Sequence, residues 1–174
     1  MDLKRALEKE HSRANTSQII SYIGLSDDKF KVLFDLFING SDTLKQRSAW
    51  VVGDIGVEQP SMIKPYLKRL INNLGAQHHN AIYRNTFRVL QEINIPTPLQ
   101  GEAVEYAFDF LTRQAVPVAI KSCAMSTIYN ISRDNPELKP ELKLIIEDQM
   151  PYASTGFKGR GAKIIAKLNK EITG

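Results

Sequence analysis

The fold is decided by the stretch Gln59-Pro60-Ser61-Met62-Ile63 and its two looser copies, Thr97-Pro98-Leu99-Gln100-Gly101 and Asn135-Pro136-Glu137-Leu138-Lys139. The three prolines are spaced 38 and 38 residues apart. Proline is favoured in the first turn of a helix, where its missing N–H would have had no partner. Each stretch leads into apolar residues at the i, i+4 spacing of one buried helix face. The pattern therefore predicts three helices that begin at equivalent points of a repeat.

A second helix repeats between these starts. It passes through Lys45 to Trp50, Ile82 to Phe87 and Ala119 to Ala124, and the cations Arg47, Arg84 and Lys121 are spaced 37 and 37 residues apart. Two helices in a period of about 38 residues indicate a solenoid. No window shows the strict alternation of a half-buried strand. We expect an all-α, right-handed α-α superhelix of four to five helix pairs, forming one domain over residues 1–174. Short helices near 2–10 and 16–24 are expected to close its N-terminal end.

The stretch Arg47 to Gly56 resembles the second helix of a HEAT repeat, in which a basic residue precedes small and aliphatic residues and a closing glycine. The resemblance covers roughly residues 25–168. It implies a non-catalytic scaffold that binds a protein or peptide on a concave surface lined by the second helices. Many unrelated scaffolds share this architecture, so the resemblance does not name a partner.

Cations at one repeat position predict a binding strip. Stacked helices lie about 8 to 10 Å apart, so Arg47, Arg84 and Lys121 would form a row on successive second helices, with Arg88 one turn beyond Arg84. Such a row suits an acidic peptide or a phosphate backbone. The alternative is that these cations form ion pairs between repeats, with partners such as Asp54, Asp42 or Glu92.

Trp50 and Asp54 stand four residues apart and would face the same way from one helix. The chain is in this respect similar to bacterial HEAT-like-repeat DNA glycosylases of alkylation repair, whose aromatic and catalytic carboxylate have that spacing. The resemblance implies DNA binding as the alternative function, with Trp50 and Asp54 as its site residues. The competing interpretation is structural, because Phe87 and Ala124 occupy the repeat position of Trp50 and predict a largely buried side chain.

The net charge of +4 lies entirely in the C-terminal segment. Residues 1–150 carry 18 basic and 18 acidic side chains, whereas residues 151–174 carry five basic and one acidic. On a helix, Arg160, Lys163, Lys167 and Lys170 would fall within an arc of roughly 80°. This basic face is a candidate contact for the phosphates of nucleic acid, for anionic lipid or for an acidic partner, with a simply solvated face as the alternative.

Other site chemistry is not predicted. The adjacent His78 and His79 have no companion ligands at metal spacing, and no nucleophile and base or paired-carboxylate arrangement stands out, so we expect no catalytic residue, metal or cofactor. The single cysteine, Cys123, excludes an internal disulfide. No apolar run reaches membrane-spanning length, and the start of the chain lacks a signal-peptide core. We therefore expect a cytoplasmic protein without a membrane span, whose oligomeric state the sequence leaves open.

Overall fold

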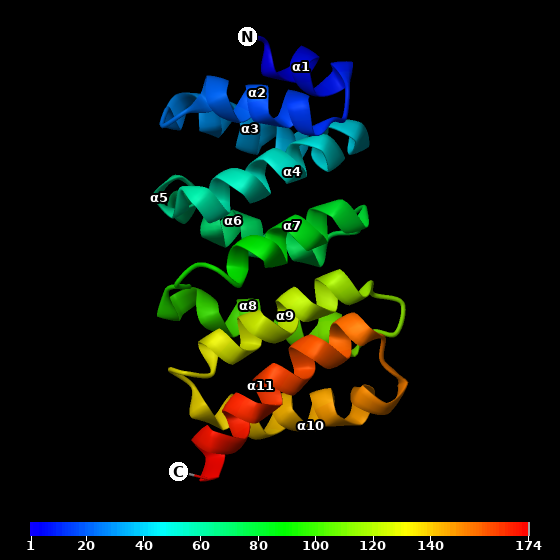
Figure 1. Ribbon diagram of the computed structural model, residues 1–174. Helices are drawn as coiled ribbons and strands as arrows, with labels where there is room; N and C mark the ends of the chain where they lie inside the picture. Colours follow the sequence, from blue (N-terminus) through cyan, green and yellow to red (C-terminus); the bar gives the residue numbers. More distant parts are fainter. Residues whose placement is uncertain (174) are drawn as a thin grey trace. The chain divides into compact units, whose positions relative to one another are not determined.

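The computed structural model describes residues 1–173, and these residues form helices joined by short loops (Figure 1). No strand occurs within this range, so the all-α prediction is confirmed. Met1–Val89 form one compact unit, and the residues from Leu90 onward form a second. The expected single cooperative domain stays a prediction, and the two units are described in turn. None of the helices in residues 1–173 has both the length and the apolar character needed to cross a membrane.

The first unit contains three helix pairs. Its elements are α1 (Leu3–Lys9), α2 (Arg13–Ile23), α3 (Asp27–Asn39), α4 (Asp42–Glu58), α5 (Pro60–Ile63), the 3₁₀ turn η1 (Lys64–Tyr66), α6 (Leu67–Asn72), the 3₁₀ turn η2 (Asn73–Gly75) and α7 (Asn80–Leu90). The helices α3 and α4 run antiparallel, and α1 and α2 pack on α4 (Figure 1). The two short N-terminal helices match the predicted ones closely.

An aromatic cluster fills the core of the first unit. Ser26 caps α3 by accepting a hydrogen bond from the Lys29 N–H, and this start places Phe30, Phe34 and Phe37 on one buried face. The ring of Tyr66 packs on two of them, at 4.6 Å from Phe34 and 5.5 Å from Phe30 between centroids. Offset or edge contacts of this kind stabilise a core beyond the area that they bury.

Two glycines let α4 and α7 approach closely. A Cβ atom added at Gly53 would lie 2.5 Å from Oδ1 of Asn85, and one added at Gly56 would lie 2.8 Å from a methyl of Val89. Real Cβ atoms do not come this close to their neighbours. Packing therefore requires glycine at both positions of this HEAT-like helix. The side chains between Gly53 and Gly56 are thereby brought against α7.

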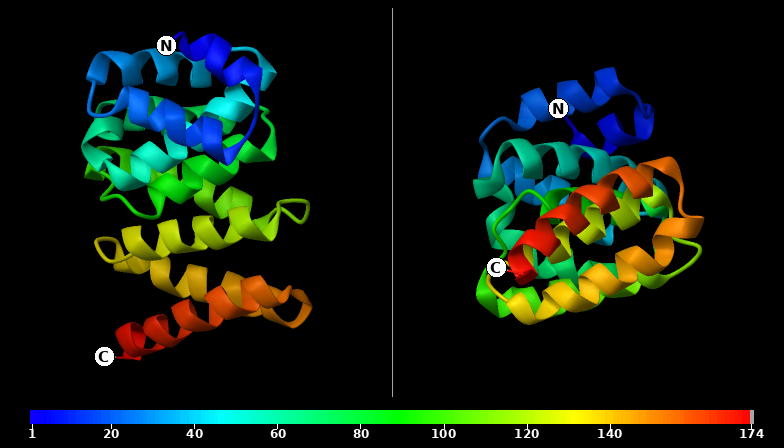
Figure 2. Two further views of the ribbon diagram at one scale, coloured as in Figure 1. Left: turned by 45° about the horizontal axis from the view of Figure 1, so that its top comes forward. Right: turned by 60° about the horizontal axis from the view of Figure 1, so that its bottom comes forward.

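The second unit contains two helix hairpins, α8 (Thr97–Thr112) with α9 (Val118–Ile131) and α10 (Lys139–Gln149) with α11 (Thr155–Thr173). The 3₁₀ turns η3 (Pro136–Leu138) and η4 (Met150–Tyr152) precede and follow α10. Figure 2 shows the partners of each hairpin running in opposite directions, and α11 packs on both α9 and α10. A Cβ at Gly161 would lie 2.9 Å from a methyl of Ile146, so this glycine permits the contact of α11 with α10.

Most of the repeat positions, but not all of them, are buried as the pattern predicts. Leu70, Leu142 and Ile146 are fully buried. Tyr66, six residues after Pro60, and Phe108, ten residues after Pro98, also lie on these helix faces, yet both are only half-buried. The repeat period therefore located the helix faces, while the depth of each side chain depends on its neighbours.

Candidate functional site

A buried carboxylate joins three helices of the first unit. Asp54 of α4 is 2% exposed, and its Oδ2 accepts a hydrogen bond from Nη1 of Arg13 on α2 at 2.6 Å. Its Oδ1 accepts one from Nη2 of Arg88 on α7, also at 2.6 Å. Both carboxylate oxygens thus have a charged donor, which is what a buried charge needs. Asp54 thus pairs with Arg88, whereas none of the repeat cations Arg47, Arg84 and Lys121 forms an ion pair among the described residues.

Trp50 lies one turn before Asp54 and is only half-buried. Trp50 is therefore less buried than Phe87 and Ala124, which are fully buried at the same repeat position. The difference arises from the neighbours of the indole. The ring of His11 meets its edge at 5.4 Å between centroids, and the guanidinium carbon of Arg13 lies 5.6 Å above its centroid. These polar side chains flank the indole.

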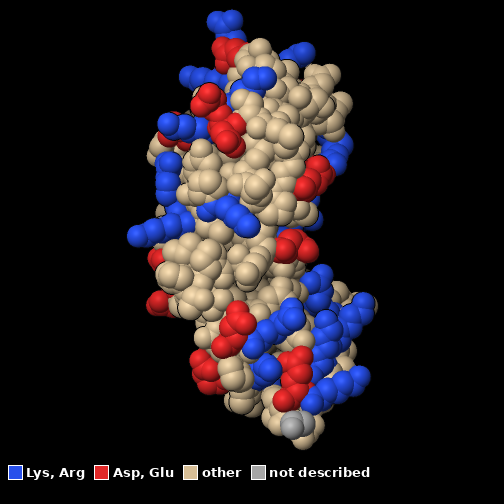
Figure 3. Space-filling view, turned by 90° about the vertical axis from the view of Figure 1, so that its left-hand side faces the viewer, with Lys and Arg blue, Asp and Glu red and all other residues tan. Residues whose placement is uncertain are grey.

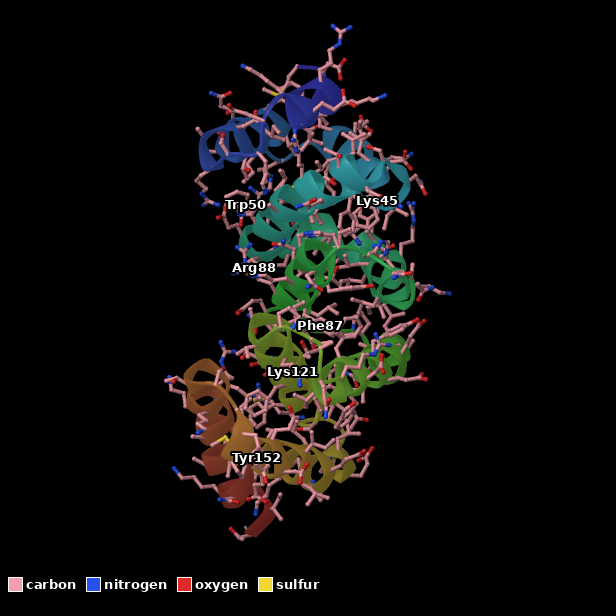
Figure 4. The ribbon with its side chains drawn as sticks, turned by 90° about the vertical axis from the view of Figure 1, so that its right-hand side faces the viewer. Lys45, Trp50, Phe87, Arg88, Lys121 and Tyr152 are labelled. Carbon is pink, nitrogen blue, oxygen red and sulfur yellow. The ribbon has the colours of Figure 1, made fainter. Side chains whose placement is uncertain are left out.

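The cluster of Trp50, Asp54, Arg13 and Arg88 is called the Trp50 face below. Two guanidinium groups and one carboxylate leave a net charge of +1 beside the indole. The side chain of Arg13 is 62% exposed and that of Arg88 is 34% exposed, so the surplus charge is open to solvent. Figure 4 shows Trp50 and Arg88 on the same side of the first unit. An aromatic surface with an adjacent cation suits an anionic or acidic partner.

The two repeat cations of the first unit differ in their surroundings. Arg47 is half-buried, and its Nη1 donates to the carbonyl oxygens of Leu7 at 2.9 Å and Glu8 at 2.7 Å, at the end of α1. It therefore satisfies helix carbonyls that would otherwise lack a partner. Arg84 is exposed, and its side chain has no partner within residues 1–173. Of the two, Arg84 is the cation that is available to a ligand.

Lys121, the third repeat cation, belongs to the second unit and is only 9% exposed. Its Nζ donates to Oε1 of Gln149 at 3.1 Å. Desolvation by burial lowers the pKa of its ammonium group below the ordinary value. Lys121 is therefore a desolvated cation, in contrast to the exposed strip residue that the sequence suggested.

The C-terminal cations lie on α11 as predicted, and all four are exposed. Arg160 donates to Oγ of Ser126 at 2.7 Å, and Nζ of Lys167 lies 5.2 Å from the ring centroid of Tyr129. Lys163 and Lys170 have no side-chain partner in the described part of the chain. Figure 3 shows Lys and Arg side chains gathered in the lower part of the molecule.

The one acidic residue of this helix has partners of its own. Glu171 accepts a hydrogen bond from the Tyr129 hydroxyl at 2.6 Å and pairs with Nζ of Lys139 at 3.0 Å. The bond from Tyr129 and then that from Lys139 lower the pKa of the Glu171 carboxyl. Glu171 is therefore occupied at one side of α11, and it leaves the exposed lysines without a neighbouring counter-ion from their own helix.

Two residues that form these contacts, Arg13 and Gln149, were not predicted as site residues from the sequence. Arg13 lies in the N-terminal helices, outside the 37-residue spacing that identified the other cations. Gln149 is a polar residue near the end of α10, and its role depends on contact with a different helix. Arg13 directly follows the helix cap Ser12, so the sequence indicates that it begins α2. It does not indicate which residue Arg13 pairs with.

Comparison with known proteins identifies the repeat. A family model described as a HEAT repeat domain matches residues 3–168, which is most of the chain. No curated protein matches the chain, and no solved structure matches it.

Proposed function

The chain belongs to the HEAT repeat family, and on that premise we propose that it is a non-catalytic scaffold that binds an acidic segment of a protein or peptide partner. HEAT repeats are commonly protein-interaction scaffolds, and the family is generally non-catalytic. The proposed contact surface within each unit is the side lined by the second helices of its pairs. Four cations of those helices are its candidate contacts: Arg47, Arg84, Arg88 and Lys121.

The observation that carries this proposal is the incomplete burial of Trp50. A large aromatic side chain on a repeat helix normally stabilises the core, and Phe87 does so at the equivalent position. Trp50 instead keeps part of its indole in water beside a cluster with a surplus positive charge. Tryptophan and arginine are enriched among the residues that dominate binding energy at protein interfaces. An acidic segment that covers Trp50 would bury the indole and neutralise the charge.

The four cations contribute unequally to this proposal. Arg84 is free to form a new ion pair, and Arg88 can share its guanidinium between Asp54 and a ligand. Arg47 already donates to two carbonyl oxygens of α1, so its contribution is the position of that helix. Lys121 lies in the second unit, where burial limits its reach. Arg84 and Trp50 are therefore the residues whose substitution tests the proposal.

The experiment begins with a displayed peptide library selected on the immobilised full chain. The dissociation constants of selected peptides are then measured by fluorescence anisotropy for the wild type, Trp50→Ala and Arg84→Glu. Lys31→Glu is the matched control, because Lys31 is an equally exposed cation on α3, the first helix of its pair. We expect selected peptides to be acidic and to bind at least tenfold more weakly to both test variants, with the control unchanged. Equal affinity for all four proteins would contradict the proposal.

A second candidate function is DNA binding, and the basic face of α11 is the observation that favours it. Arg160, Lys163, Lys167 and Lys170 are exposed on one helix whose segment holds one acidic residue. Phosphate contacts release counter-ions, so affinity for duplex DNA would fall by roughly 0.9 log units per contact for each tenfold rise in salt. Titration of labelled duplex at 50 and 200 mM salt tests this candidate directly.

Base excision, the chemistry of the glycosylases that the chain resembles, would require Asp54 to face a substrate. In the structure both Asp54 oxygens accept bonds from guanidinium groups, and the side chain is buried. We therefore place DNA binding without base excision ahead of the enzymatic alternative. Incubation with a duplex that contains 7-methylguanine separates the two, because release of the free base by the wild type and not by Asp54→Asn would establish the enzyme.

A further inference from the structure

A cavity of about 770 Å³ opens in the second unit, among the end of α8, the start of α9, α10 and the start of α11. Its volume is in the range of pockets that hold small molecules. The walls are mainly apolar and include Val116, Val118, Ile145 and Phe157. Leu144 and Tyr152 also line it and expose large apolar side chains, 67% and 93% exposed respectively. The cavity is thus an apolar space that is open to solvent at one side.

Lys121 is the one basic residue among the described residues that line this cavity. The ammonium group has three donors, and one of them is used by Oε1 of Gln149 at 3.1 Å. Nε2 of Gln149 in turn donates to the carbonyl oxygen of Leu111 at 2.9 Å. This second bond fixes the amide so that its oxygen faces Lys121. The cation is therefore held in one place by a neutral neighbour.

No carboxylate pairs with Lys121 within residues 1–173. Asp148 also lines the cavity, yet it forms no ion pair with the ammonium group. Burial of a cation without a counter-ion costs free energy. When such a cation lines a cavity, it attracts an anion strongly. Figure 4 shows Lys121 and Tyr152 in the second unit, on α9 and at the end of η4. The lining thus combines mainly apolar walls with the ammonium group of Lys121, and the one carboxylate among its described residues, Asp148, does not pair with that group.

The geometry points to a binding site for a monocarboxylate that carries an apolar group. Its carboxylate would accept hydrogen bonds from Nζ of Lys121, and its apolar group would fill the space between Val118, Ile145 and Phe157. A single point charge without an arginine fork suits a monoanion better than a phosphate, which binds through several donors. Apolar walls also exclude a highly hydrated polyanion. This site belongs to the second unit and shares Lys121 with the candidate contacts of the proposed scaffold, but it does not depend on the Trp50 face of the first unit.

Isothermal titration calorimetry of the full chain with octanoate tests the inference. Octanamide and octylamine are matched probes with the same apolar chain and a neutral or positive head. We expect octanoate to bind with one site per chain and at least tenfold more tightly than either probe. The peptide acetyl-Gly-Gly-Leu, with its free C-terminal carboxylate, determines whether the carboxylate can also come from the end of a protein chain. Weak or equal binding of octanoate and octylamine, with no binding of the peptide, would overturn the inference.

Variants locate the site. Lys121→Met removes the charge at nearly constant volume, and Lys121→Gln serves as a second replacement in case the first alters folding. Lys31→Met is the matched control, because it makes the same change at an exposed lysine of α3, which belongs to the first unit and does not line the cavity. We expect at least a tenfold loss of octanoate affinity in both Lys121 variants and none in the control. Equal affinity for all of these proteins would show that the carboxylate does not bind at Lys121.

Discussion

Replacement of Asp54 by asparagine should destabilise the chain more than the loss of any other ion pair among the described residues. The substitution preserves shape but removes the negative charge and turns an NH₂ group toward one of the two guanidinium donors. Each lost bond joins Asp54 to an arginine at 2.6 Å, and hydrogen bonds to charged groups contribute about 1.5 to 3 kcal/mol each. The two arginines are not equivalent, however.

The exposed fractions of the arginine side chains set the expected magnitude. Arg13 is 62% exposed, so water replaces much of its bond and we assign it about 0.5 to 1 kcal/mol. Arg88 is 34% exposed and is more dependent on Asp54, so we assign it about 1.5 to 2 kcal/mol. Asp54→Asn should therefore lower the free energy of unfolding by about 2 to 3 kcal/mol, which corresponds to a fall in Tm of about 5 to 10 °C for a chain of this size.

The assay is urea unfolding followed by circular dichroism, applied to the wild type, Asp54→Asn, Arg13→Gln, Arg88→Gln and the two double variants. A double-mutant cycle isolates each pairwise coupling. We expect the Arg88 coupling to exceed the Arg13 coupling by about 1 kcal/mol, as their exposure implies. An Asp54→Asn variant within 0.5 kcal/mol of the wild type, or a larger coupling for Arg13, would refute this reasoning.

Three further predictions concern other parts of the chain. Burial is the main cause that lowers the pKa of His78 below 6.5. Because the folded-state pKa is depressed, the contribution of His78 to stability is full above pH 6.5 and is lost as the pH falls through the folded pKa. Urea unfolding between pH 7.5 and 5 should show this loss, at most about 1.4 kcal/mol per pH unit, and His78→Gln should remove it. Reversal of Lys163 and Lys167 to glutamate should leave the melting temperature nearly unchanged, because both are exposed, yet weaken retention on heparin; unchanged retention would make the basic face of α11 ordinary solvated surface. Phe157→Ala should cost on the order of 3 to 5 kcal/mol in a thermal melt, since Phe157 is 1% exposed, and a loss below 1 kcal/mol would count against its place in the core.

The helix order could be predicted from the sequence because it depends on local rules. Pro60 and Pro98 lie in the first turns of α5 and α8, as the repeat spacing predicts. Pro136 begins a 3₁₀ turn, and α10 follows only at Lys139. The first helix of the third pair is broken into α5, η1 and α6, with Pro65 within η1. Proline both starts and interrupts helices, and the period alone does not separate these roles.

The candidate sites were predicted less completely because they depend on contacts between helices. The sequence placed Trp50 and Asp54 on one helix face, and it offered an inter-repeat ion pair as one role for Asp54. It gave no signal for Arg13, whose bond to Asp54 spans 41 residues. The cavity beside Lys121 depends on how α8 to α11 pack, and a volume enclosed by several elements leaves no periodic trace in a sequence.

Quenching of Trp50 fluorescence by acrylamide, with and without a saturating acidic peptide from the selection, tests the central claim most directly. Trp50 is the only tryptophan in the chain, so its emission reports on the proposed contact surface alone. We expect intermediate quenching of the free protein, because the indole is half-buried, and a severalfold smaller quenching constant when the peptide covers it. An unchanged quenching constant at saturation would contradict the claim that an acidic partner binds on the Trp50 face.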